Sequence, residues 1–254
     1  MRTLWLRFYA GLNDFLPSRW KQRTFKLGFL GRPTVREILV QLNVPPPEVA
    51  LILADGRPVD FDYRPEEGER LSFYPIFYRL LPAEPLHTLP PERPPRFLLD
   101  THLGRLARYL RMLGFDAEHL SDPDPGDAAL ARRAGDDGRV LLTRDRRLLA
   151  RKDVRYGYFV RATSPREQLA EVLNRFELHE FVDPFSRCMC CNVPLEPVEA
   201  ETVAAQLPPG IRAHYSEFYR CPACGRVYWE GSHHARMQRL IDQVVRGSGS
   251  SASH

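Results

Sequence analysis

The sequence predicts a mixed α/β protein, in which a parallel, doubly wound sheet follows a small α+β domain and precedes a short cysteine-rich module. Three observations support this fold class. Strand and turn signals surround one helix in residues 1–81, strands alternate with helices in residues 96–182, and two Cys-x-x-Cys pairs lie in residues 183–245. Strands that alternate with helices are typical of parallel sheets with right-handed crossovers. A polar, Gly/Ser-rich tail at residues 246–254 is expected to be disordered.

The composition fits folded domains outside a membrane. Hydrophobic residues make up 43% and charged residues 27% of the chain. No apolar run approaches the roughly 18 residues that a membrane span needs, and the beginning lacks the pattern of a signal peptide. We therefore expect a cytoplasmic protein with no membrane partner. The net charge is only +4, but arginine supplies most of the basic residues and suits phosphate recognition by its planar fork.

Residues 1–81 read as a β-grasp domain, with strand and helix patterns in the order ββαββ. The strands are expected at residues 3–9, 23–29, 49–53 and 71–75, and the helix at residues 33–42, with Pro33 near its start. Asp55-Gly56 is a strong hairpin signal. Through residues 34–42, Asp55-Gly56 and residues 68–75, this part of the chain resembles the ubiquitin-like sulfur carriers of the ThiS and MoaD types. Those carriers act through a free C-terminal Gly-Gly, which is missing here, so we expect an RNA-contacting or docking accessory domain, or a stabilising appendage.

A proline-rich stretch, residues 82–95, favours extended backbone and is predicted to be the linker between two domains. The α/β domain at residues 96–182 follows it. Its strands are expected at residues 97–99, 115–120, 139–143 and 156–162, and its helices at residues 103–113, from Asp127, and from Ser164. Ser164 and Glu167 have the spacing of a capping box.

Two carboxylates, Asp100 and Asp145, each follow an apolar strand of the predicted parallel sheet. Neighbouring strand ends lie roughly 5 Å apart, so both acids can converge at the edge where open α/β sheets bind ligands. Asp127, at a helix start, is the candidate for a third, although it would also serve as a simple N-cap. Converging carboxylates repel one another unless a cation lies among them, and oxygen ligands suit Mg²⁺ or Mn²⁺. The three are therefore candidate catalytic residues and metal ligands.

Basic side chains accompany these acids. Arg105, Arg108 and Arg111 recur at a spacing of three and should share the face opposite the leucines of their helix. With Arg144 they are candidates for binding phosphates of a substrate near the acids. The alternative is a solvated helix face.

Four cysteines, Cys188, Cys191, Cys221 and Cys224, form the most specific pattern in the chain. Two Cys-x-x-Cys pairs provide four thiolates for a closed, structural Zn²⁺ site, and a redox dithiol is the competing interpretation. Cys190 is expected to be a spectator. After the second pair, His233 and Arg236 are candidate contacts to a nucleic acid. Trp229 would stack on a base or pack around the zinc module.

Taken together, the segments resemble the PIN-fold ribonuclease family named for the C-terminal domain of the Mut-seven exonucleases. The similar segments are residues 97–100, 103–114, 141–145, 187–192 and 221–233. The resemblance covers about residues 96–240, and several bacterial members carry the same β-grasp domain. It implies a metal-dependent ribonuclease with an added zinc ribbon, and its acidic positions correspond to Asp100, Asp127 and Asp145. The usual fourth acid of the PIN fold has no clear match here. PIN domains are often dimers, so the resemblance also implies a possible homodimer.

Three hypotheses follow from the sequence. The first is an Mg²⁺- or Mn²⁺-dependent ribonuclease, whose substrate would be tRNA or another structured RNA. The second is a catalytically silent RNA- or tRNA-binding adaptor that uses the same basic surface and ribbon. The third is a ubiquitin-like interaction protein, which is the weaker hypothesis because it assigns no role to the carboxylates.

Overall fold

The computed structural model describes residues 2–76, 90, 92–120, 126–229 and 231. The chain divides into two compact units, one formed by residues 1–102 and 120–160 and the other by residues 103–119 and 161–254. Most of the predicted linker, the predicted tail, His233 and Arg236 lie outside the described residues. No helix in the part of the chain that the structure describes is long and apolar enough to cross a membrane.

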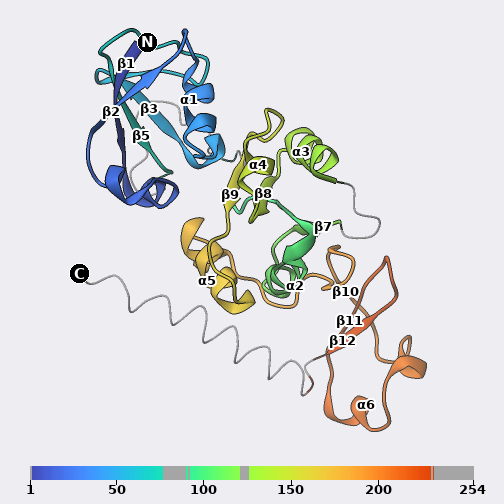
Figure 1. Cartoon of the computed structure of the whole chain (residues 1–254). Helices are drawn as coiled ribbons and strands as arrows, with labels where there is room; N and C mark the ends of the chain where they lie inside the picture. The colour runs from blue at the N-terminus through green and yellow to red at the C-terminus, as the bar shows by residue number, and fades with distance from the viewer. Residues whose placement is uncertain (1, 77–89, 91, 121–125, 230, 232–254) are drawn as a thin grey trace. The chain divides into compact units, whose positions relative to one another are not determined.

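The N-terminal part of the first unit is a five-stranded sheet with one helix against it (Figure 1). Four of its strands and the helix were predicted, whereas the two-residue strand Arg57–Pro58 was not. Its strands are β1 (Arg2–Phe8), β2 (Phe25–Phe29), β3 (Leu51–Ala54), β4 (Arg57–Pro58) and β5 (Arg70–Tyr74), in the spatial order β2-β1-β5-β3-β4. The central pair, β1 and β5, is parallel, and the other pairs are antiparallel. This is the mixed sheet of a β-grasp fold, and short 3₁₀ helices connect its elements at Ala10–Phe15, Ser18–Trp20 and Pro46–Glu48.

Alternation along β1 and β5 places one face of the sheet on the core. Leu4, Leu6 and Phe8 point inward from β1, and Leu71 and Phe73 point inward from β5. Helix α1 (Val35–Gln41) covers this face with its buried side chains. Thr34 is its N-cap and forms the capping box with Glu37 that satisfies the first N–H groups of the helix.

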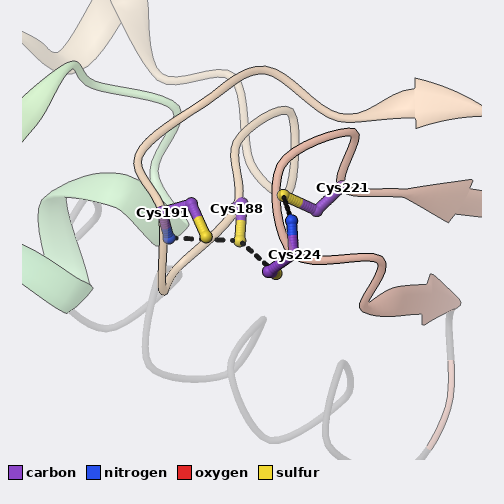
Figure 2. A group of neighbouring side chains, drawn as sticks. All are labelled: Cys188, Cys191, Cys221 and Cys224. Atoms are coloured by element: carbon purple, nitrogen blue, oxygen red, sulfur yellow. Dashed lines mark hydrogen bonds between the residues drawn. The ribbon is translucent and has the colours of Figure 1, made fainter.

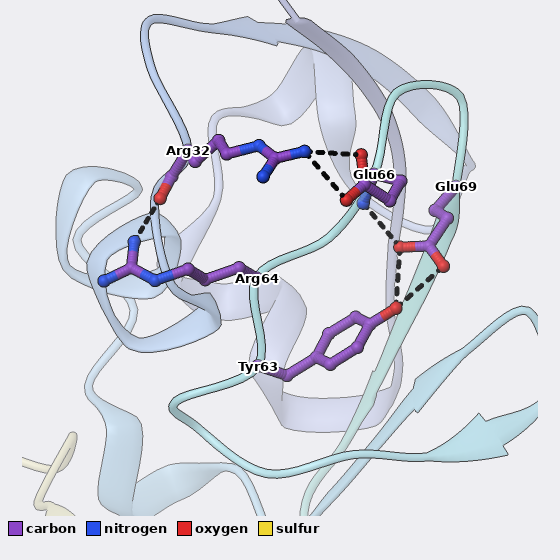
Figure 3. A network of polar contacts seen from close by, with 5 residues as sticks. All are labelled: Arg32, Tyr63, Arg64, Glu66 and Glu69. Atoms are coloured by element: carbon purple, nitrogen blue, oxygen red, sulfur yellow. Dashed lines mark hydrogen bonds and ion pairs between the residues drawn. The ribbon is translucent and has the colours of Figure 1, made fainter.

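The turn between β3 and β4 is the predicted hairpin turn. Asp55 and Gly56 have φ values of 45° and 83°, so both occupy the left-handed region that a two-residue hairpin turn requires. The longer loop between β4 and β5 is held by polar contacts (Figure 3). In that loop the Tyr63 hydroxyl donates to Glu69 at 2.8 Å, and Glu66 pairs with Arg32 at 3.1 Å.

The second part of the first unit contains the predicted parallel sheet. Strands β6 (Phe97–Leu99), β8 (Val140–Thr143) and β9 (Gly157–Phe159) pair in parallel. Helix α3 (Gly126–Asp136) and the four-residue helix α4 (Arg146–Leu149) connect them. Their apolar side chains meet Leu98 and Leu141 in one core. Helix α4 was not predicted, because a helix of four residues has no periodic pattern in the sequence.

The β-grasp part packs against β9. Glu48, which is buried, accepts a hydrogen bond from the backbone N–H of Phe159 at 2.7 Å. The ring of Phe159 meets the ring of Phe15 edge-on, with 5.8 Å between centroids. The guanidinium of Arg146 lies 5.0 Å from the Phe15 centroid and 5.2 Å from the Phe159 centroid. These contacts link the N-terminal core directly to an edge strand of the parallel sheet.

The second unit contains helix α2 (Gly104–Met112), strand β7 (Ala117–His119), helix α5 (Pro165–Arg175) and the cysteine-rich module. The last has three short antiparallel strands, β10 (Glu196–Pro197), β11 (Phe218–Arg220) and β12 (Val227–Trp229), with the one-turn helix α6 (Ile211–His214) before β11. Helix α5 begins where predicted, but the Ser164 side chain makes no cap hydrogen bond, so the capping box predicted there is wrong. Pro165 occupies the first helical position, where an N–H would have no partner within the helix and where the fixed φ of proline suits the helix.

Candidate functional site

Asp100 and Asp145 follow β6 and β8, which are adjacent parallel strands, and Thr143 connects the two residues. The Thr143 hydroxyl donates to Oδ2 of Asp100 at 2.6 Å and accepts from the backbone N–H of Asp145 at 2.9 Å. Asp100 is only 9% exposed and Thr143 is fully buried. Hydroxyl–carboxylate hydrogen bonds of this length are among the stronger ones in proteins. Thr143, the last residue of β8, thus orients a candidate ligand, although no pattern in the sequence predicted this role.

Asp145 also has a local structural task. It is the N-cap of α4, and its Oδ1 accepts from the backbone N–H groups of Arg147 at 2.7 Å and Leu148 at 3.4 Å. The cap hydrogen bonds hold the Asp145 carboxylate in place and occupy one of its two oxygens. A residue can cap a helix and bind a cation at once, since a carboxylate has about four lone-pair sites.

Asp127 lies in the first turn of α3 and is exposed. The described residues contain one group of three or more His, Cys, Asp or Glu side chains spaced to hold a metal ion, and that group is the cysteine cluster. Asp100, Asp127 and Asp145 therefore do not form a three-carboxylate group in this structure. A catalytic cation at these residues, and the role of each, stay predictions.

The predicted basic stripe of α2 divides into two parts. Arg105 and Arg108 are exposed, as a phosphate-binding role requires. Arg111 is 7% exposed, so the expectation that it shares their face is wrong. Its Nε donates to the Ala117 carbonyl at 2.7 Å, which fixes the side chain inside the second unit. Burial lowers the pKa of Arg111, in opposition to the nearby cysteines and Asp116, which raise it.

Arg144 lies between Thr143 and Asp145 and is exposed. Its Nη1 donates to the Val160 carbonyl at 3.1 Å, which holds the guanidinium beside the end of β9. Its predicted role in binding RNA remains a prediction.

The four predicted zinc ligands come together. The sulfur atoms of Cys188, Cys191, Cys221 and Cys224 all lie within 4.8 Å of one another, and those of Cys188 and Cys224 are 3.9 Å apart (Figure 2). Four sulfurs each roughly 2.3 Å from a tetrahedral zinc are roughly 3.8 Å apart, so the cluster fits Zn²⁺. Cys190 is exposed and outside the cluster, as expected.

Each Cys-x-x-Cys pair forms a turn in which backbone donates to sulfur (Figure 2). The Cys191 N–H points to the sulfur of Cys188 at 3.3 Å, and the Cys224 N–H points to that of Cys221 at 3.4 Å. Gly225, with a φ of 71°, lets the chain turn back after the second pair. Such hydrogen bonds spread the negative charge of bound thiolates over the protein.

One thiol of the cluster is set apart by its surroundings. Burial disfavours ionisation of Cys188, but hydrogen bonds from the Tyr228 hydroxyl, at 3.2 Å, and from backbone N–H groups outweigh it and lower the pKa of this thiol to about 6. A hydrogen bond with Cys224, followed by burial, raises the pKa of Cys191, and burial raises that of Cys221. Burial and the contact with Cys188 also raise the pKa of Tyr228. Cys188 thus ionises more readily than Cys191 and Cys221, which would have to release their protons for a metal to bind.

Two residues support the first pair, Arg111, which was predicted to bind phosphate instead, and Asn192, which was not predicted as a site residue. Arg111 donates from Nη1 to the carbonyls of Met189 and Cys190, at 3.1 and 2.8 Å. Asn192, directly after the pair, accepts from the Ala117 N–H at 3.0 Å and donates to Asp116 at 2.7 Å. These contacts attach the first Cys-x-x-Cys pair to α2 and β7, so a metal bound by the cluster would be coupled to the packing of this helix.

Comparisons with known proteins address both parts of the chain. A family model described as the Mut7-C RNAse domain matches residues 95–241, and one described as Mut7-C ubiquitin matches residues 1–80. Among solved structures, the small archaeal modifier protein 1 of H. volcanii is 17% identical, with a TM-score of 0.24 over 30% of this chain and 98% of that one. SAMP1 from Haloferax volcanii is 18% identical, with a TM-score of 0.25 over 30% and 97%. None of the curated proteins matches the chain.

Proposed function

Because the chain belongs to the Mut7-C RNAse domain family, whose description indicates a ribonuclease-type function, we propose that it hydrolyses RNA phosphodiester bonds with the help of Mg²⁺ or Mn²⁺. Asp100 and Asp145 are the proposed metal ligands and catalytic residues, and Asp127 is a third. The proposed fold of this part is that of a PIN domain.

The observation that carries this proposal is the connection through Thr143. Two acids follow adjacent parallel strands, and one buried hydroxyl bonds the carboxylate of the first and the backbone of the second. Ligands of open α/β sheets bind at this edge. A buried carboxylate is costly unless it is hydrogen-bonded or paired with a cation, and carboxylate oxygens are the ligands that Mg²⁺ and Mn²⁺ prefer.

The protein's own side chains have separate tasks in this scheme. A bound Mg²⁺ or Mn²⁺ would supply an activated water and neutralise charge on the phosphate. Thr143 and Thr101 hold the two oxygens of Asp100, at 2.6 and 3.1 Å, and limit its rotation. The cap bonds to α4 do the same for Asp145. Fixed oxygens need not reorganise when charge develops, which favours the transition state.

RNA binding is assigned to basic side chains and to the zinc ribbon. Exposed Arg105, Arg108 and Arg144 would contact backbone phosphates, and Arg111 is withdrawn from this set because it is buried. His233 and Arg236 remain proposed contacts of the ribbon. We propose tRNA or another structured RNA as the substrate class.

The proposed organisation follows the predicted boundaries. Residues 1–81 form the ubiquitin-like domain, 82–95 the linker, 96–182 the nuclease domain and 183–245 the zinc ribbon. Closely spaced free cysteines are typical of proteins in a reducing compartment, which supports the proposed cytoplasmic location. A homodimer is proposed only on the resemblance to PIN domains.

A catalytically silent RNA-binding adaptor is the second candidate. The observation in its favour is that Asp127 does not join Asp100 and Asp145 in a metal-sized group among the described residues. An adaptor would keep the exposed arginines and the zinc ribbon but would not require the cation.

The test is RNA cleavage by the purified full chain with Mn²⁺ or Mg²⁺, on structured and single-stranded RNA. We expect Asp100→Asn and Asp145→Asn to abolish cleavage, whereas Asp136→Asn, a matched change at an exposed residue of α3, should leave it intact. Asp127→Asn then reports whether the third acid takes part. Cleavage that survives both Asp100→Asn and Asp145→Asn would refute the assignment. RNA binding without cleavage by the unmodified chain would favour the adaptor.

A further inference from the structure

The β-grasp sheet has a second face, away from α1, and its composition is unusual for a solvated surface. Because side chains alternate along a strand, the residues between the buried ones of β1 and β5 point outward. The outward residues of the four longer strands are Thr3, Trp5, Arg7, Lys26, Gly28, Leu51, Leu53, Arg70, Ser72 and Tyr74. None of these is acidic, and three are basic. Tyr9, directly after β1, extends the row.

Aromatic rings on this face lie flat against one another or under cations. Tyr9 and Tyr74 stack with 4.3 Å between centroids and 7° between ring planes. The guanidinium of Arg7 is 5.2 Å from the Tyr9 centroid. On the neighbouring strand pair, the Lys26 ammonium is 5.7 Å from the ring of Trp5, which is 42% exposed. We name Trp5, Arg7, Tyr9, Lys26, Arg70 and Tyr74 the aromatic–basic face.

The basic groups of this face lie close to its rings. Arg70 sits opposite Trp5 in the β1–β5 register, and its Nη2 lies 3.4 Å from the hydroxyl oxygen of Thr24, at the start of β2. Arg7 and Arg70 both lower the pKa of Tyr9, after the larger effect of its hydrogen bond with Tyr74. Positive charge therefore spans β2, β1 and β5, with rings beside it.

We propose that the aromatic–basic face binds single-stranded RNA. Unpaired bases stack on exposed rings, and each base has a face to offer, so the binding is tolerant of sequence. Lys and Arg at neighbouring strands contact the phosphates between stacked bases. The absence of acidic side chains among the outward residues makes the face complementary to a polyanion. The same chain carries a ribonuclease-family domain, for which the bound RNA would be a substrate.

This function adds a binding site to the proposed nuclease and does not rest on cleavage. It also does not compete with the contact to β9, which uses Phe15 and Glu48 instead. The ubiquitin-like part would thus capture a single-stranded stretch of the RNA.

The test measures fluorescence anisotropy of a short labelled oligouridylate with the full chain, without added Mg²⁺ or Mn²⁺. Trp5→Ala should weaken binding by at least about five-fold, the lower end of the effect of losing one stacked base. Arg7→Ala with Lys26→Ala should weaken it and flatten its dependence on salt. The matched control is Arg32→Ala with Arg64→Ala, which removes the same charge from the loops near the start of α1 (Figure 3).

Ultraviolet cross-linking followed by peptide mapping gives an independent readout. We expect cross-links at Trp5, Tyr9 or Tyr74. If the double variant of the face (Arg7→Ala with Lys26→Ala) and the control double variant lose the same affinity for RNA, the loss is due to net charge alone. That result would overturn the proposal. The proposal would also be overturned if Trp5→Ala bound RNA as tightly as the unmodified chain and all cross-links lay in residues 95–241. Binding of an acidic peptide in place of RNA would overturn it as well. These binding assays omit Mg²⁺ and Mn²⁺, so their result does not depend on cleavage. A chain that binds RNA at this face but does not cleave RNA when the cation is added would refute the proposed nuclease and leave the binding site standing.

Discussion

Thr143→Val tests whether one hydroxyl organises the candidate active site. Valine has nearly the shape of threonine, so it fills the same buried space and removes little besides the hydroxyl. Two hydrogen bonds disappear together, the one donated to Asp100 at 2.6 Å and the one accepted from the Asp145 N–H at 2.9 Å. Thr143→Ser is the matched control, because it keeps the hydroxyl and loses one methyl group.

The expected magnitudes separate the two variants. A hydrogen bond to a charged group contributes about 1.5–3 kcal/mol and one to a backbone N–H about 1 kcal/mol, so Thr143→Val should lower the free energy of unfolding by about 2–4 kcal/mol. Removal of a single buried methyl group costs about 1 kcal/mol. The valine variant should therefore be the less stable of the two, although it keeps more apolar volume.

Urea unfolding monitored by circular dichroism measures both variants, and RNA cleavage measures their activity. Under the proposed function, Thr143→Val should also cut more slowly than Thr143→Ser, because Asp100 loses its orienting donor. If valine proves as stable as serine or more so, packing rather than hydrogen bonding determines this position. That result would refute the organising role of the hydroxyl.

Two further predictions concern contacts that the tertiary structure creates. Arg111→Met removes the donor to the first zinc knuckle and should weaken zinc binding about 10- to 100-fold, as loss of an outer-shell partner does, whereas Cys190→Ser should not. Competition with a chromophoric chelator measures this, and unchanged affinity in Arg111→Met would contradict it. Glu48→Ala leaves the Phe159 N–H without this acceptor and should destabilise the chain by about 1–3 kcal/mol, more than Glu48→Gln. Hydrogen exchange at the Phe159 amide should rise in the alanine variant, and protection equal to the unmodified chain would count against the contact.

Local patterns in the sequence were sufficient for most of the elements. Alternating apolar residues predicted β1 because a strand with one buried face has a period of two. Asp55-Gly56 predicted a turn whose two positive φ values few other residue pairs tolerate. Cys188, Cys191, Cys221 and Cys224 predicted their own cluster, since thiolate ligands and their spacing are specific to metal sites.

The segments that pack against α2 decide which of its arginines are exposed and which is buried. A spacing of three advances by about 300°, so the stripe rotates by about 60° at each step. From Arg105 to Arg111 the direction changes by about 120°, enough to move the last guanidinium from solvent to the carbonyls of Met189 and Cys190. Sequence periodicity specifies the angle but not what lies in that direction.

The sequence by itself determined the longer strands of the two α/β parts, the hairpin, the ββαββ order and the four clustered cysteines, because each follows from a pattern within a short segment or from the chemistry of one residue type. Only the tertiary structure decided that Thr143 holds Asp100, that Glu48 accepts a hydrogen bond from the N–H of Phe159 and that Arg111 supports the first Cys-x-x-Cys pair. These pairs are separated by 43, 111 and 78 positions in the chain. Their partners meet because apolar packing brings distant segments together, and no local pattern encodes which polar groups will then face one another.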